Sequence, residues 1–363
     1  MKFVLVAGAR PNFVKIAPLM REMKNHDGLE VRLIHTGQHY DEKMSRLFFE
    51  ELEIPRPDID LEVGSASHAV QTAEVMKRFE PVLAAESPHA VVVVGDVNST
   101  LACALTAAKM GVRIAHVEAG LRSFDRTMPE EINRILTDAI SDWLFVSERS
   151  GLENLKREGI DPARVHFVGN VMIDTLLQHR QRSEQSPILE ELELTSRRYA
   201  VLTLHRPASV DNPEILQGLM SAIQRISQQL PVVFPVHPRT AKMLNSHKTL
   251  EQTEAGGKVR QIEPLGYLDF LKLLAHARLV LTDSGGIQEE TTVLSVPCLT
   301  LRTSTERPAT IDQGTNTLAG LDPERIVTLA RNVLEERPEP RRVPDLWDGL
   351  ASRRIVETLL RTS

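Results

Sequence analysis

The sequence predicts an α/β protein made of two similar domains, each with a parallel β-sheet. Short runs of Val, Ile and Leu recur along the chain, and amphipathic helical patterns fill the intervals between them. Runs that are apolar at nearly every position are typical of parallel strands with helices on both faces. At 363 residues, the chain is long enough for two domains with separate cores.

The runs form one series in each half of the chain. The predicted strands are 3–7, 31–35, 90–94, 113–117, 143–146 and 165–168, followed by 200–204, 232–236, 259–262, 279–282 and 298–301. A stretch rich in Gln, Arg, Glu and Ser covers 178–196, and we place the boundary nearby, after Asn170. The predicted domains are therefore 1–170 and 171–345. A proline-rich linker, 338–344, precedes a last helix, 346–360.

Composition excludes several classes of protein. A net charge of -6 and a pI near 6.1 disfavour nucleic acid and anionic membranes as partners, because an acidic surface attracts neither. No apolar run is as long as a membrane span, and we expect no export signal, because the N-terminal residues lead straight into a strand pattern. Two distant cysteines in apolar contexts, Cys103 and Cys298, indicate free thiols in a reducing compartment, so we expect a cytoplasmic protein.

The stretch 279–290 contains the first candidate ligand site. A buried strand pattern runs into Asp283-Ser284-Gly285-Gly286, and a helical pattern follows. Glycines at such a turn let the backbone approach a phosphate, and the helix start directs its N–H groups at it. Glu290 falls about one helical turn behind the glycines, where a carboxylate can bind ribose hydroxyls. The alternative is that the glycines serve only a tight turn.

Cations and carboxylates follow the predicted strands of the first half. Arg10 and Lys15 lie in the first turns of a predicted helix, a place that suits a diphosphate. Asp96, Glu118 and Glu130 follow later strands or begin a helix, and carboxylates near one another suit acid/base catalysis. Helix capping is an equal explanation for Asp96, and favourable helix electrostatics is one for Glu130. Glu118 lies at a strand exit and has neither alternative.

The second half adds a histidine at a strand end. His205 is followed by Arg206 and is suited to act as an acid, a base or a phosphate ligand, although a purely structural imidazole is the alternative. The sequence has no Cys/His cluster, no Walker loop and no Gly-x-Gly-x-x-Gly after its first strand. We therefore expect chemistry without a metal and without a cofactor.

Together these motifs resemble the non-hydrolysing UDP-N-acetylglucosamine 2-epimerases. The matching segments occur in the family's order along nearly the whole chain. They are Gly8-Ala9-Arg10-Pro11 with Lys15, Gly95-Asp96, His116 to Arg122, Pro129 to Arg134, Gly169-Asn170, His205-Arg206, Asp283 to Glu290, and Thr305-Glu306-Arg307-Pro308.

The resemblance implies a glycosyltransferase-B-like fold with two Rossmann-like domains and the active site in the cleft between them. It also implies that the last helix, about 346–363, packs back on the first domain, and that the protein is a homodimer. The implied reaction interconverts UDP-N-acetylglucosamine and UDP-N-acetylmannosamine by eliminating UDP to a glycal and adding it back. Such a reaction supplies activated N-acetylmannosamine for surface polysaccharides.

The resemblance also implies a role for each matching residue. The family's diphosphate contacts match Arg10, Lys15, Ser284, Gly285 and Gly286, with Arg307 in the ligand shell. The ribose contact matches Glu290, and Phe270 stands near the position of the uracil. The catalytic carboxylates match Asp96, Glu118 and Glu130, and the cleft histidine matches His205.

Some positions depart from the family pattern. Asn12 replaces a glutamate after the proline, Pro207-Ala208-Ser209 replaces a charged run, and Gln38 to Asp41 only half matches a region where some members bind an activating nucleotide sugar. These changes leave allosteric activation and the identity of the sugar open. The rival functions are a hydrolase, including a hydrolysing epimerase, a glycosyltransferase, a nucleotide-sugar sensor, and an epimerase for a related UDP-diacetamido sugar.

Overall fold

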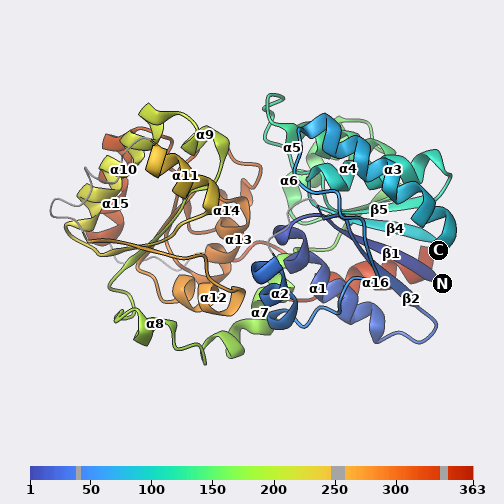
Figure 1. The fold of residues 1–363 in the computed structure, drawn as a ribbon, viewed down its shortest axis with the longest axis horizontal. Coiled ribbons are helices and arrows are strands. Elements are labelled where there is room, and N and C mark those ends of the chain that lie inside the picture. Colours follow the sequence, from blue (N-terminus) through green and yellow to red (C-terminus); the bar gives the residue numbers. More distant parts are fainter. Residues whose placement is uncertain (38–41, 247–257, 336–341, 363) are drawn as a thin grey trace. The chain divides into compact units, whose positions relative to one another are not determined.

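The computed structural model describes residues 1–37, 42–246, 258–335 and 342–362 (Figure 1). At Arg10 and at 42–46 it describes the backbone alone. The segment Gln38 to Asp41, which bears on allosteric activation, lies outside these residues. The chain divides into two compact units, Met1–Gln178 with Asp345–Ser363, and His179–Pro344.

The first unit is built on a parallel sheet of order β3-β2-β1-β4-β5-β6-β7. Its strands are β1 (Lys2–Ala7), β2 (Glu30–His35), β3 (Ile59–Asp60), β4 (Ala90–Val94), β5 (Arg113–Ala119), β6 (Trp143–Val146) and β7 (Val165–Phe167). The chain moves outward from β1 in one direction and from β4 in the other. The crevice at the carboxyl ends of β1 and β4 is therefore the topological switch point, where such sheets bind ligands.

Helices cover both faces of this sheet, with α3, α4 and α5 in one layer and α1, α2 and α16 in the other (Figure 1). The helical elements are α1 (Arg10–Lys24), α2 (Glu42–Glu51), α3 (His68–Glu86), α4 (Asn98–Lys109), α5 (Pro129–Ile140), α6 (Arg149–Arg157), the 3₁₀ turn η1 (Pro162–Arg164), α7 (Val171–Ser183) and α16 (Ala351–Thr362). Because both faces are covered, β4 is buried at every position, as its unbroken apolar run predicts.

The second unit repeats this plan with the strand order β10-β9-β8-β11-β12-β13, and every described strand pair is parallel. Its strands are β8 (Ala200–Thr203), β9 (Val232–Pro235), β10 (Val259–Ile262), β11 (Leu279–Thr282), β12 (Cys298–Thr300) and β13 (Asn316–Leu318). Here the switch point lies between β8 and β11. The predicted α/β architecture with two Rossmann-like units is thus confirmed.

The helices of the second unit also lie on both faces of its sheet, with α10 and α15 in contact on one face and α12 and α13 in contact on the other (Figure 1). They are α8 (Ile188–Glu191), α9 (Pro207–Val210), α10 (Pro213–Ser227), α11 (Pro238–Ser246), α12 (Tyr267–Ala275), α13 (Gly285–Leu294), α14 (Ala309–Asp312) and α15 (Pro323–Glu335). No helix in the described ranges has the length and apolarity needed to cross a membrane.

The last helix, α16, packs on α1 of the first unit. The Asp174 carboxylate of α7 accepts hydrogen bonds from the N–H groups of Ala351 (3.1 Å) and Ser352 (2.7 Å) at the start of α16. At the other end of the helix, the Trp143 indole donates to the hydroxyl of Thr362 (2.8 Å). The division between the units falls within α7, whereas the sequence placed the boundary just before this helix.

Candidate active site

Asn12 fixes the turn that follows β1. Its side-chain oxygen accepts hydrogen bonds from the N–H groups of Gly8 and Ala9, both at 3.0 Å. Its side-chain nitrogen donates to the carbonyl of Val94 at the end of β4 (3.1 Å). The residue that departs from the family pattern thus ties the two strands of the switch point together. Arg10 begins α1 here, but its side chain lies outside the described part of the protein.

Lys15 and Glu118 form a buried ion pair at this switch point. The Lys15 ammonium contacts Oε2 of Glu118, and the two side chains are only 7% and 6% exposed. Gly95 packs against both of them, since a Cβ at this position would lie 2.9 Å from Lys15 Nζ and 3.3 Å from Glu118 Oε2. Two residues far apart in sequence, one predicted to bind phosphate and one predicted to move a proton, are therefore direct partners.

Glu118 has a strained backbone. Its φ of 76° lies in the left-handed region, which residues other than glycine rarely adopt. The strain coincides with a register shift between β5 and β6, where the pairing skips from Val117 to Ala119. Bulges of this kind redirect a side chain, and strained residues of this kind cluster at functional sites. The conformation of Glu118 therefore supports its assignment to chemistry.

A buried polar chain lies behind Glu118. The His116 ring meets the carbonyl of Gly95 through Nε2 (2.9 Å) and the carboxylate of Asp138 through Nδ1 (2.6 Å). Asp138 also accepts from the N–H of Gly120 (3.0 Å) and pairs with Arg122 (2.7 Å). Burial alone would raise the pKa of Asp138, but the charges and hydrogen bonds of His116 and Arg122 lower it. These hydrogen bonds hold His116 and Gly120, the residues on either side of Glu118.

Asp96 is paired with a buried cation at the edge of the site. Its Oδ2 accepts from Nε (3.1 Å) and Nη2 (2.8 Å) of the buried Arg134, whereas the N-cap of α4 is Val97. Arg134 also pairs with Glu131, whose carboxylate accepts from the N–H groups of Ser123 and Phe124. Asp96 thus belongs to a rigid charged network at the edge of the site.

Glu130 differs from its neighbour Glu131 in its surroundings. It lies in the first turn of α5 and is half-buried. Within the described residues its carboxylate has no hydrogen-bond or ion-pair partner, so it is the candidate carboxylate least committed to the fold.

In the second unit, Ser284 is the N-cap of α13, and Gly285 and Gly286 are its first helical residues. The Ser284 side chain makes no capping hydrogen bond, and the Gln288 side chain holds the Ser284 carbonyl at 3.1 Å. Free N–H groups at a helix start bind anions well, and the helix dipole favours negative charge there. The geometry of this turn therefore suits a phosphate.

Asp283, one residue before this turn, holds His205. It accepts hydrogen bonds from the N–H groups of His205 (3.0 Å) and Arg206 (2.9 Å) and pairs with the His205 ring nitrogen Nδ1 (2.8 Å). Burial would raise the pKa of Asp283, but these charged and hydrogen-bonded neighbours lower it to about 2. His205 is 41% exposed at its side chain, so its other ring nitrogen is available to a ligand.

Charged side chains crowd around the start of α13. Glu306 is buried and contacts three guanidinium groups, those of Arg302 (2.8 Å), Arg206 (3.4 Å) and Arg307. Arg307 also pairs with the buried Glu289 of α13 (2.8 Å). Arg307 lies against Gly285, because a Cβ at that glycine would fall 2.8 Å from its Cζ. The guanidinium of Arg307 therefore lies against the turn that was predicted to bind phosphate.

Glu290 is fully buried one turn further along α13. The hydroxyl of Tyr267 donates a hydrogen bond to its carboxyl (3.3 Å). Burial raises the pKa of Glu290 to about 8; the Tyr267 bond opposes this increase, and the charge of Glu289 adds to it. Phe270 is partly buried on the same helix as Tyr267, α12. Glu290 and Phe270 are thus presented by neighbouring helices of one unit.

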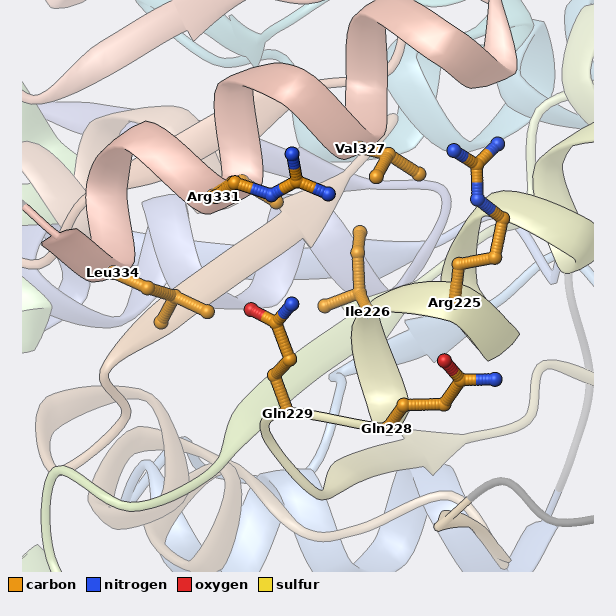
Figure 2. Close-up of a pocket in the computed structure, with 8 residues that line it drawn as sticks. Arg225, Ile226, Gln228, Gln229, Val327, Arg331 and Leu334 are labelled. Carbon is orange, nitrogen blue, oxygen red and sulfur yellow. The ribbon is translucent and has the colours of Figure 1, made fainter.

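The two pockets found in the second unit are not at the start of α13. One, of about 100 Å³, lies between α10 and α15 (Figure 2), and its lining is Arg225, Ile226, Gln228, Gln229, Val327, Ala330, Arg331 and Leu334. A larger one, of about 830 Å³, reaches from Leu192 to Leu334. Neither contains a residue that the motifs single out. Among the described residues no group of three or more His, Cys, Asp or Glu side chains is placed to hold a metal ion.

Comparison with known proteins agrees with these motifs. The family model "UDP-N-acetylglucosamine 2-epimerase" matches residues 21–360. The chain is 44% identical to the UDP-N-acetylglucosamine 2-epimerase of Methanococcus maripaludis over 339 residues, 92% of each chain. The chain belongs to the UDP-N-acetylglucosamine 2-epimerase family. The resemblance is confirmed, and with it the expectation that the protein is an isomerase of this family.

Two further relatives bear on the function of this epimerase family member. A crystal structure of the Methanocaldococcus jannaschii UDP-GlcNAc 2-epimerase, in complex with UDP-GlcNAc and UDP, matches with a TM-score of 0.94 and 41% identity. The match covers 99% of this chain and 100% of that one and confirms the glycosyltransferase-B-like fold. The UDP-2,3-diacetamido-2,3-dideoxy-D-glucuronate 2-epimerase of Pseudomonas aeruginosa is 43% identical over 366 residues, 99% of this chain and 100% of its own.

Sequence reasoning missed several charged partners in this epimerase. Arg302 follows β12 in the same way that Ser284 follows β11, so the rule of polar residues after strand ends could have found it. Arg134 and Glu306 lie inside motifs that were recognised, but their partners could not be read from the sequence. Tyr267 carries no sequence signal for its bond to Glu290, because the two residues meet only through the packing of α12 on α13.

Proposed function

We propose that this protein interconverts UDP-N-acetylglucosamine and UDP-N-acetylmannosamine. The observation that carries the proposal is the buried pair of Lys15 and the strained Glu118 at the switch point of the first unit. It combines a cation suited to a phosphate with a carboxylate suited to proton transfer. Membership of the epimerase family and the anion-ready start of α13 support the same substrate class.

The proposed substrate contacts follow from charge and position. Ser284, Gly285 and Gly286 bind the diphosphate through the helix start, and Arg307 adds a guanidinium beside them. Lys15, together with Arg10, adds positive charge from the first unit. The remaining proposed contacts are Glu290 to the ribose, Phe270 at the uracil and His205 to the phosphates or sugar. Arg10 is assigned by the family motif alone.

The proposed chemistry is elimination followed by addition. A carboxylate removes the proton at carbon 2, the bond from carbon 1 to the phosphate oxygen breaks, and UDP leaves with the bonding electrons. The product of this step is a glycal with a double bond between carbons 1 and 2. UDP then attacks carbon 1 again while a proton is added to the opposite face of carbon 2. Positive groups at the diphosphate stabilise the leaving charge, which is a large effect in enzyme sites.

The contact with Lys15 indicates at which step of the proposed reaction Glu118 acts. In the structure, Glu118 Oε2 holds the Lys15 ammonium, so that oxygen cannot accept a proton from a substrate while the contact lasts. A diphosphate offers Lys15 a competing anion, and transfer of Lys15 to it leaves Glu118 free to act as the base. Glu130 and Asp96 are the further catalytic candidates, and Asp96 acts within its pair with Arg134.

A deuterium experiment tests this proposal. The protein is incubated with UDP-N-acetylglucosamine in heavy water, and the products are followed by NMR. We expect a mixture of two UDP-sugars, reached from either side, with deuterium at carbon 2. Glu118→Gln should lower turnover by roughly a hundredfold or more, the usual worth of acid/base catalysis, with UDP binding retained. The exposed Glu153→Gln is the matched control.

Two outcomes contradict the proposal. Epimerised product with only protium at carbon 2 would exclude elimination. Free sugar and UDP as the sole products would indicate the hydrolysing type of enzyme.

The Pseudomonas relative favours a second candidate, epimerisation of a UDP-diacetamido sugar acid. That substrate carries an extra carboxylate, so an enzyme adapted to it needs a cation near carbon 6. Measuring kcat/KM for both substrates side by side decides between them. A higher value for the diacetamido sugar acid would assign the protein to that substrate.

With UDP-N-acetylglucosamine as substrate, the product supplies activated N-acetylmannosamine for surface polysaccharides. Loss of that sugar from the surface of cells that lack the protein is the test.

We further propose that the protein is a homodimer that uses the outer face of α5. Ile132 and Leu136, one turn apart on this helix, are 42% and 46% exposed, and Phe124 in the preceding loop is 73% exposed. Exposed apolar side chains grouped in this way are typical of contact surfaces between proteins. Leu136→Asp should shift the sedimentation coefficient to that of a monomer, whereas Leu350→Asp should not. A wild-type protein that sediments as a monomer contradicts the proposal.

Placement in the cytoplasm is a proposal that rests on the cysteines. Cys103 and Cys298 are both buried and unpaired, which suits a reducing compartment. Cell fractionation with an antibody against the protein is the test, and recovery outside the cytoplasmic fraction would contradict it.

A further inference from the structure

Arg302 is a buried cation with a nitrogen that the protein does not use. It follows β12, and its side chain is 7% exposed. Its Nη2 donates to Oε2 of Glu306 at 2.8 Å, but its Nη1 is buried and has no hydrogen-bond partner in the described part of the chain. A buried donor without a partner destabilises the fold, because it has lost its hydrogen bonds to water and gained none in return. Such a cost calls for an explanation in function.

The charges around Arg302 do not balance. Arg206, Arg302 and Arg307 surround Glu306, and Glu289 pairs with Arg307. The cluster therefore holds one more positive than negative charge, at the positive end of the α13 dipole. Burial lowers the pKa of Arg302, its pair with Glu306 raises it, and repulsion from Arg206 and Arg307 lowers it further. An additional anion at this place would relieve that repulsion.

Glu306 is the residue through which Arg302 acts. Its Oε1 contacts Arg307 and Arg206, while its Oε2 is occupied by Arg302. Arg307 and Arg206 can turn toward a phosphate only if Glu306 keeps a cation of its own when they leave. Arg302 supplies that cation, because it donates to the other carboxylate oxygen of Glu306 and is buried behind it.

We propose that Arg302 is a positioning residue for the diphosphate: it neutralises Glu306, so that Arg307 and Arg206 present their charge to the phosphates. The inference rests on the proposed function, in which the α13 start binds the diphosphate of a UDP-sugar. It adds a residue that acts on the leaving group through its neighbours. Without Arg302, Glu306 competes with the phosphates for both remaining arginines.

A series of ligands with increasing charge tests this role. Uridine, UMP and UDP are titrated by calorimetry into wild type, Arg302→Gln and Arg302→Lys, with the exposed Arg331→Gln as control. We expect Arg302→Gln to weaken UDP at least tenfold, UMP less, and uridine within twofold of wild type. Arg302→Lys should bind UDP more tightly than Arg302→Gln does, because lysine keeps the positive charge but lacks the several N–H donors of the planar guanidinium. Arg331→Gln should match wild type for all three ligands.

A double variant separates positioning from packing. Arg302→Gln/Glu306→Gln removes the competing carboxylate together with the cation that neutralised it. We therefore expect the double variant to bind UDP several times more tightly than Arg302→Gln alone. If Arg302 only supports the fold, the double variant should be as weak as the single variant or weaker. Glu306→Gln alone should leave UDP affinity nearer to wild type than Arg302→Gln does.

Three results overturn the inference. Equal loss for uridine, UMP and UDP in Arg302→Gln would show a packing role. Unchanged UDP affinity in a folded Arg302→Gln protein would show that the residue does not act on the phosphates. Wild-type protein that binds UDP no more tightly than uridine would refute the diphosphate site itself, and this result, unlike the other two, is read without any variant.

Discussion

Glu290→Gln should change the pH dependence of stability in a predictable direction. Burial raises the pKa of Glu290 in the folded protein from an ordinary value of 4.5 to about 8. Between these values the folded protein holds a proton that the unfolded chain has lost. The free energy of unfolding therefore falls as pH rises through this window, and the loss is complete above about pH 8.

The size of this effect follows from the shift. Each unit of pKa corresponds to about 1.4 kcal/mol, so the full shift corresponds to roughly 5 kcal/mol of stability lost by pH 9. Relaxation of the site reduces this figure, and we expect about 2–5 kcal/mol. Glutamine keeps the size of the neutral acid and an oxygen that accepts the Tyr267 bond. The variant should therefore match wild type near pH 5 and exceed it increasingly toward pH 9.

Calorimetric melting and hydrogen exchange of the α13 amides measure this difference. Because the two tryptophans, Trp143 and Trp347, both lie in the first unit, their fluorescence does not report on Glu290. For a unit of this size, about 2 kcal/mol corresponds to roughly 4–8 °C in melting temperature. Tyr267→Phe should move the midpoint of the wild-type pH dependence upward, since the Tyr267 bond lowers the pKa of Glu290.

A flat difference between Glu290→Gln and wild type from pH 5 to 9 would refute the reasoning. So would a variant that is less stable than wild type at pH 9. The exposed Glu263→Gln is the control and should follow wild type throughout.

Two further variants test the packing of the site and of the last helix. Gly285→Ala places a methyl group 2.9 Å from Glu306 Oε1 and displaces Arg307. The free energy of UDP binding measured by calorimetry should therefore weaken by about 1.5–3 kcal/mol, the contribution of a charge-assisted hydrogen bond. Unchanged affinity would contradict this geometry. Asp174→Ala leaves two N–H groups of α16 without their acceptor. It should lower the free energy of unfolding, followed by tryptophan fluorescence, by about 1–3 kcal/mol, and Asp174→Asn should lower it less. Equal stability of Asp174→Ala and wild type would show that this cap is not needed.

The sequence predicted the fold and the strand ends that carry charge because both depend on local patterns. An unbroken apolar run indicates a strand buried on both faces, as β4 proves to be. The edge strands β3 and β13 were not predicted, because each contains only one apolar residue, Ile59 and Leu318, and so shows no apolar run. Glu118 was singled out because a strand exit gives an acidic residue no capping role. Its positive φ could not be read from its neighbours.

Pairing between charges was the part that the sequence could not supply. Lys15 and Asp96 were each identified, but their partners, Glu118 and Arg134, depend on the parallel order of β1, β4 and β5 and on α5 beside them. For Asp96 the sequence left open a capping role and gave no indication of its pair with Arg134. A side chain's nearest countercharge is set by tertiary packing, so a motif identifies charged residues without identifying their partners.

These pairings change the energetics expected of ligand binding. In each unit, the cation proposed for the diphosphate already has a buried carboxylate, Glu118 for Lys15 and Glu306 for Arg307. A diphosphate must therefore exchange one anion for another, and the net gain is smaller than the number of new contacts suggests. The exchange also has different consequences in the two units. In the proposed mechanism, a released Glu118 neutralises its charge by accepting the proton of carbon 2, whereas a released Glu306 would keep an uncompensated buried charge. Only the second case needs a permanent replacement cation, and Arg302 is in position to be that cation.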